Sequence, residues 1–364
     1  MKFEDKMYWL WLSMIQDMWH KKALDIMRVF ETPAELYHAK RETLEKTGIF
    51  KESDIYNITS SRQIFDMERE WDKLEKRGIR FVCEKESTFP GKLLLYSDRP
   101  MWLYYKGNLP DNSEKLAGMV GARICSRYGK VMAENISSQL AAYSVNVVSG
   151  MARGIDASSH KGCMDGGGKT YAVLGCGVDV CYPRENIELY MRIQENGGIL
   201  SEYPPGTQPM AWQFPERNRI ISMLSDTVAI IEAKRKSGSL ITTDYALAYG
   251  KEIFAVPGRT CDICSEGCND LIKSGASLLT EAKDMLFSLG VFLDDKEDIN
   301  SYKKNIVLEK ENEVVYSCLC LEPKSIEELT NITGMTSDKL LEVLMKLMVD
   351  GLVTEPAKNH YARV

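Results

Sequence analysis

Short apolar runs that alternate with amphipathic segments are the feature of residues 115–285 that most limits the fold of this chain. The runs are LAGMVG (116–121), VNVVSG (145–150), YAVLG (171–175), GGILSE (197–202), TVAIIE (227–232) and EIFAVPG (252–258). The amphipathic stretches between them lie near 128–143, 154–166, 184–196, 214–224 and 240–250. Short strands that are apolar throughout and separated by helices are typical of a parallel sheet buried on both faces. The pattern predicts a doubly wound α/β domain.

The segments on either side of this domain differ from it in composition and periodicity. Residues 1–78 have apolar side chains at three- and four-residue spacing, which predicts a helical domain. Two β-rich pieces within 80–110 lead into the α/β domain, which we place at 79–290. Residues 291–308 are charged and aperiodic, as expected of a linker. Residues 309–364 predict three helices and a short hairpin, the order of a winged helix.

Composition excludes several classes of protein. No apolar run approaches the ~20 residues that cross a bilayer, so no membrane partner is expected. The N-terminal segment lacks the pattern of a signal peptide, and the ten cysteines are therefore interpreted as free thiols of a cytoplasmic protein.

Charge is distributed unevenly along the chain. The net charge of −6 argues against a nucleic-acid partner for the chain as a whole. Residues 115–290, however, hold 18 basic and 18 acidic side chains, which leaves room for a local basic groove. Residues 309–364 hold 6 basic and 10 acidic side chains and are not expected to form a primary DNA-binding surface.

The ends of the predicted strands are rich in Gly, Ser, Arg and Lys. They read GARICSRYG (121–129), SGMARGID (149–156), GCGVD (175–179), SEYPPG (201–206), EAKRKSGSLIT (232–242) and PGR (257–259). Ligands of an open parallel sheet bind at this edge, and glycine turns before helices present N–H groups to phosphate. Gly121, Gly150 and Gly154 fit that role. Arg123 and Arg153 would add charge, as would Lys169, although it lies just before the third run.

A second basic cluster opens the segment QFPERNRIISMLSD (213–226). Arg217, Asn218 and Arg219 lie at the start of a predicted helix, where positive charge opposes the helix dipole. Two interpretations stay open: the arginines bind an anion, or they pair with Glu202 and Glu232 at neighbouring strand ends. Nearby Trp212 and Phe214 are candidates for stacking on bases, with core packing favoured for Phe214.

Motifs for other chemistry are missing. The first strand end has no G-x-G-x-x-G fingerprint, and no Walker A sequence occurs. Cys261, Cys264 and Cys268 have zinc-like spacing but no fourth cysteine nearby, so free thiols are favoured over a metal site. His160 has no obvious nucleophile beside it and is interpreted as structural. No catalytic residue, metal or cofactor is predicted.

Seven motifs in register make the chain resemble the DNA-processing protein DprA (Smf) family. They are VGAR-x-x-S-x-YG, SG-x-ARGID-x-x-x-H, YAVLG-x-G-x-D-x-x-YP-x-x-N, SEYPPGT-x-P, FP-x-RNRII, SGSLIT and AVPG, spread over about residues 80–285. The resemblance implies an extended Rossmann-like domain flanked by an N-terminal SAM-like helical domain and a C-terminal winged helix. It also implies single-stranded DNA binding, RecA loading during natural transformation and recombination, homodimers through the Rossmann-like domain, and no catalytic activity.

The resemblance assigns DNA-phosphate contacts to Arg123 and Lys169. The full set of predicted DNA-binding residues is Gly121, Ala122, Arg123, Ser149, Gly150, Arg153, Gly154, Lys169, Arg217, Asn218, Arg219, Ser239 and Asn269. Ala122 stands where the family commonly has Ser or Thr, so a hydroxyl donor is missing and only the backbone N–H remains. The alternative function is a Rossmann-type phosphoribohydrolase of nucleoside monophosphates. Its Pro-Gly-Gly-x-Gly-Thr-x-x-Glu turn is replaced here by SGSLITTDYA.

Overall fold

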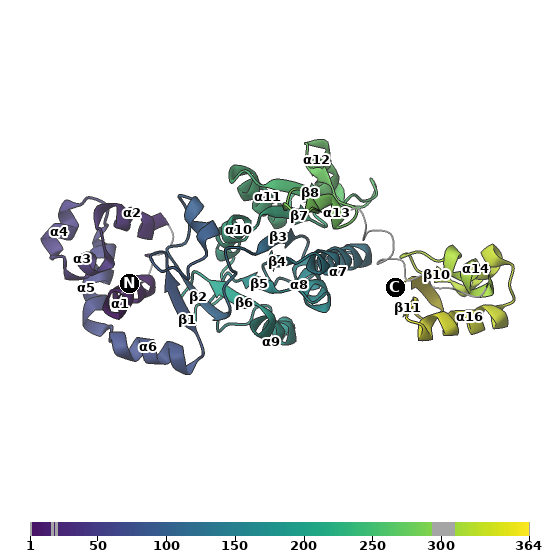
Figure 1. Cartoon of the computed structure of the whole chain (residues 1–364), viewed down its shortest axis with the longest axis horizontal. Helices are drawn as coiled ribbons and strands as arrows, with labels where there is room; N and C mark the ends of the chain where they lie inside the picture. Colours follow the sequence, from purple (N-terminus) through teal and green to yellow (C-terminus); the bar gives the residue numbers. More distant parts are fainter. Residues whose placement is uncertain (1, 16–17, 19–20, 293–309, 364) are drawn as a thin grey trace. The chain divides into compact units, whose positions relative to one another are not determined.

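The computed structural model describes residues 2–15, 18, 21–292 and 310–363. It divides the chain into two compact units, Met1–Val291 and Phe292–Val364 (Figure 1). The predicted linker 291–308 lies outside the described residues apart from its first two positions. No described helix has the length and apolar character needed to cross a membrane.

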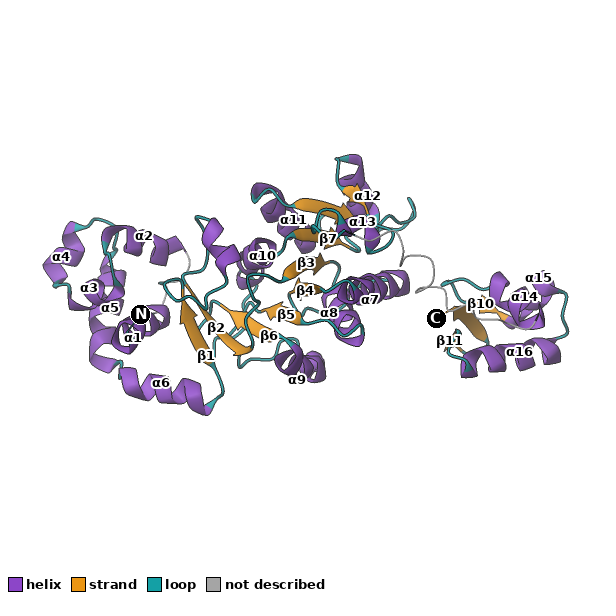
Figure 2. Cartoon of the chain, viewed as in Figure 1, coloured by secondary structure: helices purple, strands orange, loops and turns teal. Residues whose placement is uncertain are grey.

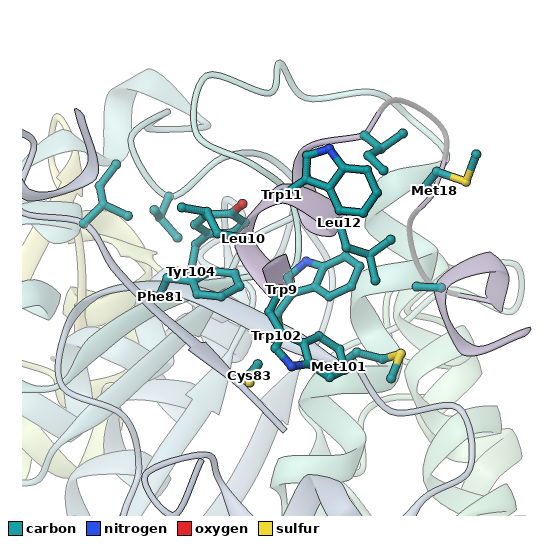
Figure 3. Packing of buried hydrophobic residues seen from close by; sticks show 14 of the residues in the cluster. Trp9, Leu10, Trp11, Leu12, Met18, Phe81, Cys83, Met101, Trp102 and Tyr104 are labelled. Carbon is teal, nitrogen blue, oxygen red and sulfur yellow. The ribbon is translucent and has the colours of Figure 1, made fainter. Parts of the chain in front are cut away.

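The first unit begins with the helices that the periodicity of residues 1–78 predicts. They are α1 (Phe3–Met14), α2 (Lys21–Val29), α3 (Pro33–His38), α4 (Arg41–Lys46), α5 (Glu52–Ile64) and α6 (Met67–Lys76). Helix α1 carries FEDKMYWLWLSM and buries Trp9, Leu10, Trp11 and Leu12. These side chains pack with residues of β1 (Arg80–Cys83) and β2 (Trp102–Gly107), as Figure 3 shows. The helices therefore share a core with the sheet across the predicted boundary at 78/79.

A nine-stranded sheet forms the centre of the first unit, in the order β1-β2-β6-β5-β4-β3-β7-β8-β9. Its remaining strands are β3 (Lys115–Val120), β4 (Val145–Ser149), β5 (Thr170–Val173), β6 (Gly198–Ser201), β7 (Thr227–Ile230), β8 (Glu252–Ala255) and β9 (Ser277–Leu278). Strands β3 to β9 pair in parallel, so the predicted doubly wound sheet is confirmed. The β-rich pieces of 80–110 are more than a lead-in, because β1 and β2 extend this sheet in antiparallel pairing.

Helices connect the strands (Figure 2). They are α7 (Arg127–Ala142), α8 (Ile155–Asp165), α9 (Ile187–Asn196), α10 (Gln213–Leu224), α11 (Gly238–Ala248) and α12 (Glu266–Lys273), with short 3-10 turns η1 (Gly91–Leu95) and η2 (Arg184–Asn186). Helix α13 (Lys283–Leu286) follows the last strand, β9. From β3 the chain moves through β4, β5 and β6 on one side and returns to β7 on the other. The pair β3/β7 is therefore the topological switch point, where doubly wound sheets bind ligands.

The second unit has its own core and the predicted winged-helix order. Its elements are α14 (Lys310–Cys318), β10 (Lys324–Ser325), α15 (Ile326–Thr333), α16 (Ser337–Val349), β11 (Val353–Ala357) and β12 (His360–Arg363). The strands form a sheet in the order β10-β12-β11. Ser325 and Glu328 make a capping box at the start of α15, which explains why the helix begins there.

Candidate functional site

A cavity of about 650 Å³ lies at the switch point of the sheet. Its walls come from the loops after β3, β4 and β7 and from the start of α10. Residues from segments far apart in the sequence line it, among them Gly121–Ile124, Asp156, Tyr182, Phe214, Pro215, Arg217, Asn218, Lys234, Lys236–Ser239 and Thr242. The sequence predicts ligand binding at the carboxyl edge of the sheet, and this cavity lies at that edge.

Three exposed cations line this cavity without forming an ion pair with any described residue. They are Arg123 after β3, and Lys234 and Lys236 after β7. The intervening Arg235 differs, because its Nε donates to Asp270 at 2.9 Å. The Arg123 guanidinium lies over the Phe214 ring, 5.0 Å from its centre. The cavity wall is therefore positive in a chain whose net charge is −6.

Arg217 and Asp156 form the buried floor of the cavity. Arg217 donates through Nη1 to the carbonyl oxygens of Gly150, at 2.8 Å, and Val173. Asp156 accepts from the backbone N–H groups of Gly150 at 3.2 Å and Ala152 at 3.3 Å. Burial raises the pKa of Asp156, and Arg217 opposes that rise. These contacts hold the turn after β4 in place. Arg217 therefore stabilises the backbone of that turn and also lines the cavity.

The predicted arginine–glutamate pairing is half correct. Arg219 is buried and binds both carboxylate oxygens of Glu202, at 2.8 and 2.7 Å. Its guanidinium is therefore bound by Glu202 inside the protein, and its DNA contact stays a prediction. Glu232 pairs with neither arginine: it accepts from the Ser126 backbone N–H at 2.8 Å and from the Ser126 hydroxyl, which caps α7.

Three of the predicted DNA-binding residues use their hydrogen-bond donors inside the protein. The Ser149 hydroxyl is buried and donates to the Met119 carbonyl at 2.5 Å. The Gly150 N–H is the one bound by Asp156. The Ala122 N–H donates to the Glu232 carbonyl oxygen at 2.8 Å, so the backbone donor expected at this position is also used.

Two predicted cations lie away from the main cavity. Lys169 stands before β5, at the amino end of the strand, and its Nζ is 2.9 Å from a Glu114 oxygen. It therefore does not share a groove with Arg123. Arg153 is 58% exposed, pairs with Glu185 at 2.5 Å, and lines a smaller adjoining cavity of about 40 Å³ together with Gly150.

Some of the remaining predicted residues line the cavity, and others support the loops around it. Asn218 and Ser239 line the cavity, as do Gly121 and Ala122. Gly154 is at φ +72°, and a Cβ there would lie 2.4 Å from the Ala122 carbonyl oxygen, so the position needs glycine. Asn269 instead binds the backbone of Gly258 through both amide atoms and holds the loop after β8.

Sequence reasoning missed three side chains of the cavity wall. Lys234 and Lys236 belong to the strand end EAKRKSGSLIT, whose basic run was the available signal. Tyr182 has no signal beyond its place in the YP motif. Trp212 is 52% exposed but packs edge-on to Tyr203 and does not line the cavity.

The clustered cysteines differ in burial. Cys268 is buried and its Sγ lies 3.7 Å from the Ile230 carbonyl oxygen, whereas Cys261 is exposed. Within the part of the chain that the structure describes, no three His, Cys, Asp or Glu side chains are arranged to hold a metal ion.

Comparison with known proteins places this site in a family. The model of the DNA recombination-mediator protein A family matches residues 80–290. The DNA processing protein DprA of Streptococcus pneumoniae is 43% identical over 220 residues, which cover 60% of this chain and 76% of that protein.

Solved structures similar to this chain come from proteins of the same kind. The X-ray structure of the S. pneumoniae protein has a TM-score of 0.65 at 33% identity and covers 79% of this chain and 98% of that chain. A Helicobacter pylori DNA processing protein A, described for its single-stranded DNA binding mode, has a TM-score of 0.52 at 28% identity over 58% of this chain and 95% of that chain. The chain belongs to the DNA recombination-mediator protein A family.

Proposed function

We propose that the cavity at the switch point binds the sugar-phosphate backbone of single-stranded DNA. The observation that carries this proposal is the set of three exposed cations, Arg123, Lys234 and Lys236, that line one cavity and pair with no described carboxylate. Unpaired cations on a cavity wall repel one another unless an anion lies between them. The H. pylori relative described as binding single-stranded DNA supports a DNA phosphate as that anion.

The buried floor gives the site its rigidity. Arg217 and Asp156 hold the turn after β4, and the Arg123 side chain rests on Phe214. A phosphate therefore meets charges that are already placed, which reduces the entropy lost on binding. Because Lys234 and Lys236 lie on a different loop from Arg123, the cavity offers contacts to more than one phosphate of a strand.

We infer a binding protein rather than an enzyme. Among the described residues that line the cavity, the single carboxylate is that of Asp156, which accepts two backbone hydrogen bonds and supports the turn. The family relationship does not favour the nucleotide phosphoribohydrolase alternative, and α11 carries GSLITTDYALA without the glutamate of that group.

The wider role follows from the resemblance to the family. We infer that the protein protects incoming DNA and loads RecA during natural transformation and recombination, as a cytoplasmic homodimer through residues 79–290. Light scattering of the full chain tests the dimer. Retention of RecA on the immobilised DNA-bound protein tests the partner.

The test of DNA binding is fluorescence anisotropy with a labelled oligo-dT strand across a salt series. We expect Arg123→Ala to weaken binding about tenfold and to reduce the salt slope by about 0.7, the value for one single-strand phosphate. Lys234→Ala combined with Lys236→Ala is expected to reduce the slope further.

Lys169→Ala is the matched control. It removes the same charge at the opposite edge of the sheet, where Glu114 pairs with it, and is expected to leave affinity unchanged. Equal losses for Lys169→Ala and Arg123→Ala, or binding that ignores salt, would contradict the proposed site.

A further inference from the structure

Among the described residues that line the proposed DNA cavity, Tyr182 is the one exposed aromatic ring. It follows β5 in the chain, is 41% exposed, and lines both the main cavity and the smaller one beside it. Its hydroxyl makes no hydrogen bond with a described residue. The side chain therefore keeps a large apolar surface open to solvent with no polar contact that would explain its position.

Three side chains in contact, those of Tyr182, Phe214 and Arg123, connect Tyr182 to the proposed phosphate site. The Tyr182 ring lies 5.4 Å from the Phe214 ring, with their planes at 33°. The Arg123 guanidinium also lies over the Phe214 ring, 5.0 Å from its centre. Phe214 thus fixes an exposed ring and an unpaired cation at neighbouring places in one cavity.

The chemistry of a nucleotide matches this pair of neighbours. A phosphate and its base are separated by a single sugar, so a strand whose phosphate binds Arg123 has a base within reach of the adjacent wall. Aromatic rings bind bases through their faces, without regard to sequence, because every base has a π face. In a duplex those faces are covered by neighbouring base pairs, so stacking on a protein ring requires an unpaired base.

We propose that Tyr182 is a base-stacking platform that selects unpaired bases next to the phosphate bound by Arg123. This inference rests on the proposed function and adds to it the side chain that distinguishes single strands from duplexes. Its occupant is a nucleobase of any sequence.

The test pairs protein variants with two strands in the anisotropy assay. One strand is oligo-dT, and the other has the same length and phosphates but abasic tetrahydrofuran residues. The full-length proteins are wild type, Tyr182→Phe, Tyr182→Ala, Arg123→Ala and Tyr56→Ala. Tyr56 is 67% exposed on α5 and serves as the matched control for losing an exposed tyrosine.

We expect wild type to bind oligo-dT about tenfold more tightly than the abasic strand, in the range reported for stacking on one ring. Tyr182→Ala should lose that difference and bind the two strands equally. Tyr182→Phe and Tyr56→Ala should behave as wild type. Unchanged affinity of Tyr182→Ala for the abasic strand also shows that the variant is folded.

Other outcomes overturn the inference and separate it from the proposed function. If Tyr182→Ala weakens both strands equally, or neither, the ring is not a base platform. If Arg123→Ala still weakens both strands in that case, the phosphate site stands and only the stacking role fails. If wild type binds neither strand, the proposed function fails and the inference with it.

Discussion

At the scale of single residues, buried charges divide into those that build the site and those that build the core. Arg219 and Glu202 are both buried and joined by two hydrogen bonds at 2.8 and 2.7 Å. Removing one partner leaves the other charge buried and uncompensated. We expect Arg219→Ala to lower the free energy of unfolding by about 3–5 kcal/mol in urea titrations. Arg123→Ala, at an exposed position, should change it by less than about 0.5 kcal/mol; similar losses for both would refute this assignment.

His160 makes stability depend on pH. It is buried with Nδ1 2.6 Å from the Thr170 hydroxyl, and burial together with Arg217 lowers its pKa to about 3. The unfolded chain, with an ordinary pKa of 6.5, binds the proton first as pH falls, so stability is lost from pH 6.5 downward.

We therefore expect wild type to lose about 2 kcal/mol more than His160→Asn between pH 7 and pH 5. Urea unfolding of both proteins at pH 7 and at pH 5 measures this difference in stability. The comparison removes the contribution of Asp156, whose raised pKa acts in the opposite sense in both proteins. Parallel pH profiles of the two proteins would contradict a lowered pKa of His160 in the folded state.

At the scale of elements, the loop after β3 depends on the start of α8. The Ile155 N–H donates to the Ala122 carbonyl at 3.2 Å, and the Ile155 side chain fills the space where Gly121 lacks a Cβ. Gly154 approaches the same carbonyl. The position of the loop that carries Arg123 is thus set by a helix about thirty residues later in the chain.

We expect Gly154→Ala to destabilise the fold and weaken DNA binding together, because its methyl group would displace this loop. Gly167→Ala is the control: its φ of +82° imposes similar backbone strain, but nothing lies within 4 Å of the added Cβ. Gly167→Ala should lower the free energy of unfolding by only about 1 kcal/mol and leave the affinity for DNA unchanged. Anisotropy and urea unfolding of the two variants measure both effects, and equal losses of affinity would contradict the loop argument.

At the scale of the whole molecule, the two units have separate cores. The second unit packs Val315, Leu329, Leu344, Leu347 and Tyr361 around its own centre. Its segment 309–364 is net acidic, and α16 carries Asp338 and Glu342. A surface of this sign repels DNA phosphates.

Deleting residues 292–364 is therefore expected to leave oligo-dT affinity within about twofold of wild type, with the same salt slope. Anisotropy of the truncated chain, with circular dichroism to verify folding, tests this. A tenfold loss in a folded product would assign DNA contacts to the second unit.

The sequence by itself determined the strands β3 to β8, the helices between them and the edge where the cavity lies. These features depend on local periodicity and on residue types next to strand ends. Tertiary structure decided which side chains are free at that edge. Arg219 is paired with Glu202, 17 residues away in the chain, and Lys169 lies at the opposite edge, paired with Glu114, 55 residues away. Lys234 and Lys236 form no ion pair with a described residue, whereas Arg235 between them binds Asp270. Charge pairing depends on distance in space, and the sequence pattern does not encode that distance.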